Sequence, residues 1–118
     1  MAKKETFDFS KFKFDKDGLI PVVVQDYESG EVLLIGEMDK EAVEKTFETG
    51  YVHYYSAESK AAVKFGKDKG NTQKVRVAFL DSEGEKLLLK VTQKGVANTE
   101  KGAYSCFDKQ ILGQYNNI

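Results

Sequence analysis

Two neighbouring segments of this chain alternate apolar and polar residues, and this alternation most constrains the fold. In residues 73–80 and 86–93 an apolar side chain recurs at every second position: Val75, Val77 and Phe79, then Leu87, Leu89 and Val91. A period of two places such a row on one face of a β-strand. A short acidic stretch, residues 81–85, joins the segments. We therefore predict two adjacent antiparallel strands, each with one buried apolar face.

Further strands are predicted on both sides of this pair. Residues 19–25 contain three consecutive valines, and residues 32–35 form a second apolar stretch. Glu28-Ser29-Gly30 between them is a turn signal, so the two stretches predict a hairpin. Residues 51–56 are rich in β-forming residues, and residues 105–112 predict one last strand.

One short helix is predicted over residues 40–49. Asp39 is a natural N-cap, and Gly50 is suited to the left-handed conformation that ends many helices. Four residues share one helical face and predict its buried side: Ala42, Val43, Thr46 and Phe47.

Four phenylalanines mark the N-terminal segment, at positions 7, 9, 12 and 14. Their two-residue spacing predicts a peripheral strand within residues 1–11, with the rings in the core. An exposed aromatic binding face is the alternative. Residues 113–118 are interpreted as a tail.

The whole chain has 118 residues, which fits one domain spanning 1–118. We predict an α+β fold with a mainly antiparallel sheet of five to six strands and one short amphipathic helix. The net charge is −1, which argues against nucleic-acid and membrane partners. One cysteine, no secretory signal and no apolar stretch of about 20 residues predict a cytoplasmic protein.

Several motifs, in order, resemble one known family. They run from Phe12 to Phe107 and include Val52-His53-Tyr54-Tyr55-Ser56, Gly70-Asn71-Thr72-Gln73 and Ser105-Cys106-Phe107. Together they resemble phosphoribosyl-AMP cyclohydrolase. The resemblance implies a homodimer with active sites at the subunit interface. It also implies a phosphoribosyl-purine nucleotide as substrate, hydrolytic opening of the purine ring in histidine biosynthesis, and zinc and magnesium as cofactors.

The zinc ligands of that family are mostly absent here. The family has cysteines in Asp-Cys-Asp, Ala-Cys-His and Ser-Cys-Phe contexts, where this chain has Ser82, Asn98 and Cys106. Catalytic zinc usually takes three protein ligands from Cys, His or carboxylate. Since the chain holds one cysteine and one histidine, a three-thiolate site cannot be built within one chain. We do not expect zinc.

Magnesium is a possible cofactor on the same resemblance. The family's Asp-x-Asp-x-Asp run corresponds to Asp81, Glu83 and Glu85, which together with Cys106 are the candidate metal ligands. Carboxylates at alternate positions suit a hard cation. The alternative is a solvated acidic turn built around Gly84.

The remaining candidates concern substrate and catalysis. His53 is the candidate catalytic residue, with a buried, hydrogen-bonded structural role as the alternative. A glycine-rich loop with lysines can bind phosphate, or can simply be solvated. With the family motifs it gives these candidate substrate-binding residues: Ser56, Lys64, Lys67, Gly70, Asn71 and Gln73. Cys106 is a candidate nucleophile or a semi-buried thiol.

Three functions follow from these observations. The first is a divergent relative that keeps a phosphoribosyl-purine pocket but has lost or changed zinc-dependent hydrolysis. The second is an active cyclohydrolase with an altered metal site. The third is a structural or protein-interaction dimer.

Overall fold

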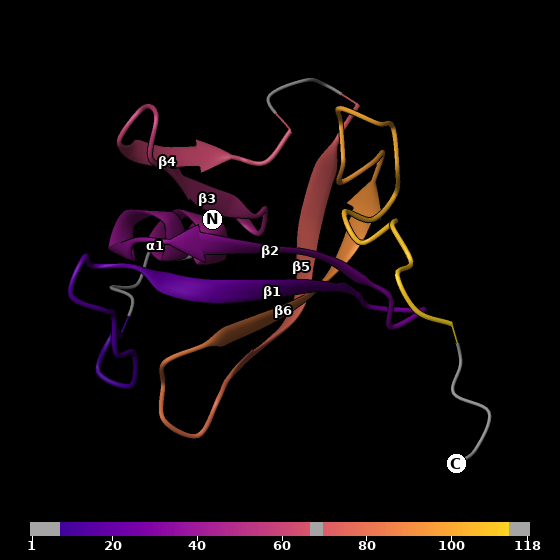
Figure 1. The fold of residues 1–118 in the computed structure, drawn as a ribbon. Coiled ribbons are helices and arrows are strands. Elements are labelled where there is room, and N and C mark those ends of the chain that lie inside the picture. The colour runs from indigo at the N-terminus through magenta and orange to yellow at the C-terminus, as the bar shows by residue number, and fades with distance from the viewer. Residues whose placement is uncertain (1–7, 67–69, 114–118) are drawn as a thin grey trace, which may run out of the picture.

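The structure is a computed structural model that describes residues 8–66 and 70–113. The described residues form six strands and one helix, in this order (Figure 1): β1 (Ile20–Asp26), β2 (Val32–Met38), α1 (Lys40–Thr49), β3 (His53–Ser56), β4 (Ala61–Lys64), β5 (Thr72–Leu80) and β6 (Leu87–Lys94). The predicted α+β class, the strand number and the single helix are confirmed. No helix in the described ranges is long and apolar enough to cross a membrane.

The strands form two sheets. The larger has the order β2-β1-β6-β5, and the smaller pairs β3 with β4. All pairs are antiparallel except β1 with β6, where Val22 lies opposite Leu87 in a parallel ladder. The larger sheet is therefore mixed, and the parallel pair lies at its centre. A parallel pair needs a long crossover, and here the crossover carries β2, α1, the small sheet and β5.

The core lies on one face of the larger sheet. The inward side chains of β1 and β6 are fully or almost fully buried, and they include Ile20, Val22, Val24, Leu87, Leu89 and Val91. The helix packs on β2, β3 and β4, and β3 also contacts β2. The helix and the small sheet thus form one subdomain joined to the larger sheet.

Both ends of α1 match the sequence prediction. The Asp39 side chain accepts the backbone N–H of Ala42 at 2.8 Å. Gly50 adopts φ 84° and donates its N–H to the Thr46 carbonyl. The predicted inner face is confirmed, with Ala42, Val43 and Thr46 buried and Phe47 packed against the core.

A bulge in β5 overturns one prediction. Val75 lies opposite Val91, but Val77 lies opposite Lys90 because the register shifts between Val75 and Val77. One extra residue in a strand reverses the faces of all residues that follow. Val75 therefore packs against the core, whereas Phe79 lies on the outer face and is 51% exposed. The prediction that Val75, Val77 and Phe79 share one face is wrong.

The predicted strand over residues 105–112 does not form. The chain there makes one backbone bond to the larger sheet, from the Cys106 N–H to the Leu33 carbonyl, and then continues without regular structure to Gly113. One backbone bond is too few to define a strand.

The N-terminal phenylalanines pack as predicted but not in a strand. Residues 8–11 contain a turn, and no strand forms there. Phe9, Phe12 and Phe14 contact the core, with ring centroids 5.8–5.9 Å apart. Phe7 and the rest of residues 1–7, like residues 114–118 of the predicted tail, lie outside the described residues.

Candidate functional site

Two groups of candidate residues lie at opposite ends of the β5–β6 hairpin, while His53, Ser56 and Lys64 lie on the small sheet. Asn71 precedes β5 and Cys106 follows β6, so both lie at the end where the connection before β5 meets the loop after β6 (Figure 1). Asp81, Glu83 and Glu85 lie in the turn at the other end. A nine-residue strand spans roughly 25 Å at about 3.3 Å per residue. Within one chain, therefore, the acidic residues do not join the other candidates.

Asn71 connects the two loops at the first end. Its side-chain oxygen accepts the backbone N–H of Val96 at 2.9 Å. A Cβ on Gly66 would collide with the Asn71 backbone, and a Cβ on Gly95 would collide with the Asn71 side chain. Both glycines also adopt positive φ, 71° and 86°, where side chains are disfavoured. The Gly-Asn motif therefore has a structural role that its sequence alone did not reveal.

Gln73 takes part in a buried row of polar side chains. The Tyr54 hydroxyl donates to its side-chain oxygen at 2.5 Å, and its side-chain nitrogen donates to the Gln93 oxygen at 2.8 Å. The Gln93 nitrogen donates in turn to the Tyr104 carbonyl at 2.8 Å. We call Tyr54, Gln73 and Gln93 the glutamine relay. It links β3, β5 and β6 to the loop over residues 95–106.

Burial sets the chemistry of Tyr54. Loss of contact with water raises the pKa of its hydroxyl, and the nearby Cys106 thiol adds to the effect. The phenol therefore stays protonated at neutral pH and is available as a donor. Its ring also covers Gly36, where a Cβ would lie 2.8 Å from a ring carbon.

His53 is buried, at 8% exposure, and both its backbone and its ring are hydrogen-bonded. Its N–H donates to the Thr46 hydroxyl at 2.9 Å, which ties β3 to α1. Its Nδ1 lies 2.8 Å from the Tyr51 carbonyl. A carbonyl can only accept, so Nδ1 carries a proton in this contact. These bonds give His53 a structural role.

Cys106 is held at the edge of β2. Its N–H donates to the Leu33 carbonyl at 2.7 Å, and the Ser105 hydroxyl beside it donates to the Val32 carbonyl at 2.7 Å. Partial burial, then the charge of Asp108, raises the pKa of the thiol. Because the thiolate is the reactive and metal-binding form, these surroundings favour a thiol that is neither.

The acidic turn is built around Asp81. Its Oδ1 accepts the backbone N–H groups of Glu85 and Lys86 at 2.8 and 3.1 Å, and its Oδ2 lies 3.6 Å from the Lys86 ammonium. Desolvation opposes these bonds, but together they lower the pKa of Asp81. Glu83 and Glu85 are exposed. Asp81 thus shapes the turn, and only the two glutamates extend freely from it into solvent.

The remaining substrate candidates have local contacts. Ser56 accepts the backbone N–H of Ser59 at 3.2 Å, inside the β3–β4 turn. The Lys64 ammonium lies 4.8 Å from the centre of the Tyr51 ring. Gly70 has open space where a side chain would stand. Lys67 lies outside the described residues.

The donor set does not fit the family's zinc. Cys106 has a raised thiol pKa, and the Nδ1 of His53 is bonded to a carbonyl. Within the described ranges, no three His, Cys, Asp or Glu side chains are grouped to hold a metal ion. No catalytic step through zinc follows from these residues.

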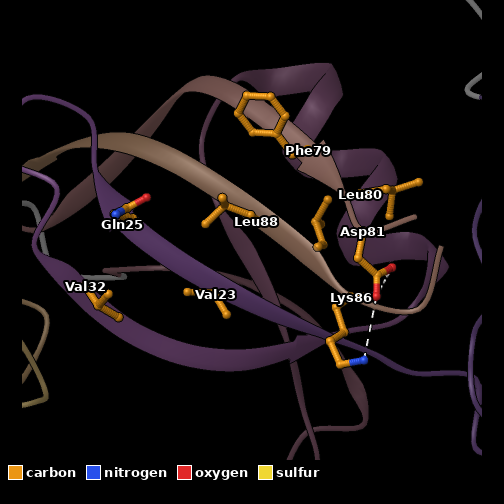
Figure 2. A pocket seen from close by; sticks show the side chains of 9 residues that line it. Val23, Gln25, Val32, Phe79, Leu80, Asp81, Lys86 and Leu88 are labelled. Carbon is orange, nitrogen blue, oxygen red and sulfur yellow. Dashed lines mark hydrogen bonds and ion pairs between the residues drawn. The ribbon is translucent and has the colours of Figure 1, made fainter. Parts of the chain in front are cut away.

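An apolar groove lies on the outer face of the larger sheet, away from both candidate clusters except at Asp81. It has a volume of about 520 Å³ and is lined mainly by side chains of β1, β5 and β6 (Figure 2): Val23, Gln25, Val32, Phe79, Leu80, Asp81, Lys86, Leu87 and Leu88. The Asp81–Lys86 ion pair closes one end.

Sequence reasoning missed two members of the relay. Tyr54 entered the sequence analysis only as part of a family motif, and Gln93 was not among the candidate residues. A signal for Gln93 was present, because it continues the inward row of Leu87, Leu89 and Val91. A polar residue at a core position must find a partner, and Gln73 lies directly opposite.

The mixed sheet, the small sheet packed on α1, and the polar residues buried between two loops define a small α+β domain with a loop-built polar site. The family described as phosphoribosyl-AMP cyclohydrolase matches residues 34–108, more than half of the chain. The chain belongs to this family. The matched range contains the glutamine relay, both loops and the acidic turn.

Individual relatives extend the match. A phosphoribosyl-AMP cyclohydrolase of Methanococcoides burtonii is 41% identical over 106 residues, 90% of this chain and 87% of the relative. One of Trichormus variabilis is 41% identical over 99 residues, 84% of this chain and 85% of the relative. A histidine biosynthesis bifunctional protein of Aquifex aeolicus is 40% identical over 103 residues, and the chain spans 50% of its length.

Proposed function

We propose that this chain is a phosphoribosyl-AMP cyclohydrolase with an altered metal site, which opens the purine ring of its nucleotide substrate by hydrolysis. The observation that carries the proposal is about 40% identity, over most of the chain, to relatives named for this reaction. Keeping the family's reaction with a changed set of metal ligands requires fewer changes to the sequence than acquiring a new function on the same fold.

The proposed nucleotide pocket lies where the loop around Asn71 meets the loop over residues 95–106. Gly70 is exposed and leaves its backbone open to a ligand, as phosphate binding by backbone N–H groups requires. Lys64 and Ser56 on the small sheet supply a charge and a hydroxyl. His53 Nε2 is the proposed proton acceptor, since Nδ1 is bonded to Tyr51.

A homodimer is part of the proposal. The outer face of the larger sheet exposes Ile35 at 60% and Phe79 at 51%, beside the apolar groove. Burying such a face on a second copy is favourable. A dimer would also bring a partner's acidic turn toward the loops that lie roughly 25 Å away in one chain. Magnesium, held through the exposed Glu83 and Glu85, is the cofactor we propose; we expect no zinc.

The small number of possible zinc ligands favours a second function. With one cysteine of raised pKa and one histidine, the chain would bind the phosphoribosyl-purine without hydrolysing it. This is the divergent, pocket-keeping relative that the missing cysteines predict.

One assay separates the two. Purified protein is stripped of metal, mixed with phosphoribosyl-AMP and magnesium, with or without zinc, and followed by absorbance, with the Methanococcoides burtonii relative as control. Turnover with magnesium alone, near the control's rate, supports the altered-site enzyme. Absent turnover, combined with a thermal stabilisation by AMP or phosphoribosyl-AMP, supports the binding protein. Absence of both refutes the two functions and leaves the interaction dimer.

A further inference from the structure

The glutamine relay has one possible direction. The Tyr104 carbonyl carries no proton, so the Gln93 nitrogen must donate to it. The Gln93 oxygen then faces Gln73, which must present its own nitrogen. The Gln73 oxygen is left for the Tyr54 hydroxyl proton. The Tyr104 carbonyl, together with the Gly95 carbonyl 3.4 Å from the same nitrogen, therefore fixes both amide orientations and the direction of the Tyr54 O–H bond.

The relay is buried and fully paired. Gln73 is 0% exposed and Gln93 is 9% exposed. In the part of the chain that the structure describes, no buried side-chain nitrogen or oxygen lacks a hydrogen-bond partner. Loss of one link would leave a buried donor or acceptor unpaired, which costs more than the link itself contributes. The Tyr104 carbonyl is therefore held firmly against β6.

The carbonyl end of the relay restrains the loop over residues 95–106. Gln93 bonds Tyr104 from the side of β6, while Ser105 and Cys106 bond the carbonyls of β2. At its other end the same loop receives Asn71. The loop is thus fixed between two strands and the connection before β5, and Gln93 supplies the link from β6.

We infer that Gln93 is a positioning residue for the nucleotide pocket: through the Tyr104 carbonyl it holds the 95–106 loop in the arrangement that receives the substrate. This inference rests on the proposed function for the pocket itself. Gln93 contacts no reacting atom in it and acts through the loop.

The decisive variant is Gln93→Glu. A protonated glutamic acid can accept from Gln73 and donate to Tyr104, whereas the carboxylate can only accept. Burial raises the pKa of such a carboxyl above its usual value of about 4.3. The relay should therefore be intact in acid and broken as pH rises through the raised pKa. Substitution that acted only through packing would show no such pH dependence.

The chain's only cysteine reports on the loop without any activity. Cys106 is exposed, so its reaction with dithiodipyridine can be timed from pH 5 to 8 for variant and wild type. We expect a rate ratio near one in acid, rising at least about threefold by neutral pH. A loop released from β6 loses part of the desolvation that raises the pKa of the Cys106 thiol, so more reactive thiolate is present. If wild type turns over phosphoribosyl-AMP, KM should rise over the same pH range more than kcat falls.

The other ionisable groups near Gln93 should not change the ratio of the variant's thiol reaction rate to that of wild type. Tyr54 and Tyr104 have raised pKa values, the latter to about 12 through burial and its bond to Asp26, so both stay protonated. Asp26 has a lowered pKa because Ser29 donates to it, so it stays ionised. Lys74 and Lys94 are exposed on the two strands. Cys106 itself is present in both proteins.

Three further variants test whether the effect is specific to the Gln93 bonds. Gln25→Glu makes the same change at an exposed bond to the Gly30 carbonyl, and its ratio should stay near one at every pH. Gln93→Leu removes both links without charge and should raise the ratio equally at all pH values. If Gln93→Glu does not fold at neutral pH, Gln93→Leu and Tyr54→Phe provide the measurement.

The outcomes for the pocket and for the relay are separable. A folded Gln93 variant whose thiol ratio stays at one throughout overturns the positioning role. A wild-type protein that neither binds nor hydrolyses the nucleotide refutes the proposed function, while the thiol ratio still reports on the relay.

Discussion

At the scale of single residues, Asn71 has a structural role that the Gly-Asn motif did not predict: it connects two loops through its bond to Val96. The Asn71→Ala substitution leaves the Val96 N–H without its partner and should lower the free energy of unfolding by about 1–2 kcal/mol. Asn71→Asp keeps an acceptor oxygen in place and should cost less. Urea denaturation of the three proteins measures both effects. Equal stability of the alanine variant and wild type would show that this bond contributes nothing.

Asp26 carries a pH dependence of known sign. The Ser29 N–H bonds it at 2.8 Å and the Tyr104 hydroxyl at 2.9 Å, and together they lower its pKa. A lowered folded-state pKa means stability that is present above about pH 4 and lost as pH falls through the folded value. Because the site is largely solvated, we expect Asp26→Asn to cost less than about 1 kcal/mol at pH 7. Denaturation at pH 7, 4 and 2.5 should show the difference from wild type shrinking in acid; a constant difference contradicts the assignment.

At the scale of elements, local chemistry predicted α1 almost completely and β5 only in part. Each end of the helix is determined by one residue, Asp39 at the start and Gly50 at the end, and both caps form as predicted. The bulge between Val75 and Val77 leaves no trace in the sequence, since the alternation continues through it. Which face of β5 is buried depends on pairing with β6, and pairing is a property of two strands rather than one.

The contact of β2 with β3 makes a further prediction. The Tyr54 ring lies on Gly36, and a Cβ there would be 2.8 Å from it. Gly36→Ala should therefore destabilise the fold by about 1–3 kcal/mol through overpacking. Gly70→Ala is the matched control, because open space surrounds that position. Thermal unfolding compares them, and an unaffected Gly36→Ala would mean that the ring moves aside at no cost.

At the scale of the whole molecule, the site is assembled from segments far apart in sequence. The family motifs identified Gln73, yet its partners Tyr54 and Gln93 lie 19 and 20 residues away. Their convergence follows from the β5–β6 register and from the docking of the small sheet. Asp81, Glu83 and Glu85 are neighbours in the sequence, but their position at the far end of the hairpin from the other candidates needed the strand pairing.

The outer face of the larger sheet leads to the last prediction, which concerns assembly. If two copies bury this face, wild type should be dimeric by light scattering at micromolar concentration. Phe79→Glu, which places a charge in the apolar groove, should yield a folded monomer because an unpaired charge is costly to bury. Glu44→Lys reverses a charge on the exposed side of α1, away from that face, and should leave the dimer intact.

Measuring hydrolysis of phosphoribosyl-AMP by the same variants tests whether the dimer is needed for activity. If the acidic turn of one copy serves the loops of the other, the Phe79→Glu monomer should lose hydrolysis of phosphoribosyl-AMP while keeping its circular dichroism spectrum. Glu44→Lys should retain both. A wild-type protein that stays monomeric and still hydrolyses the nucleotide would mean that one chain suffices, and that Glu83 and Glu85 act, if at all, from where the hairpin places them.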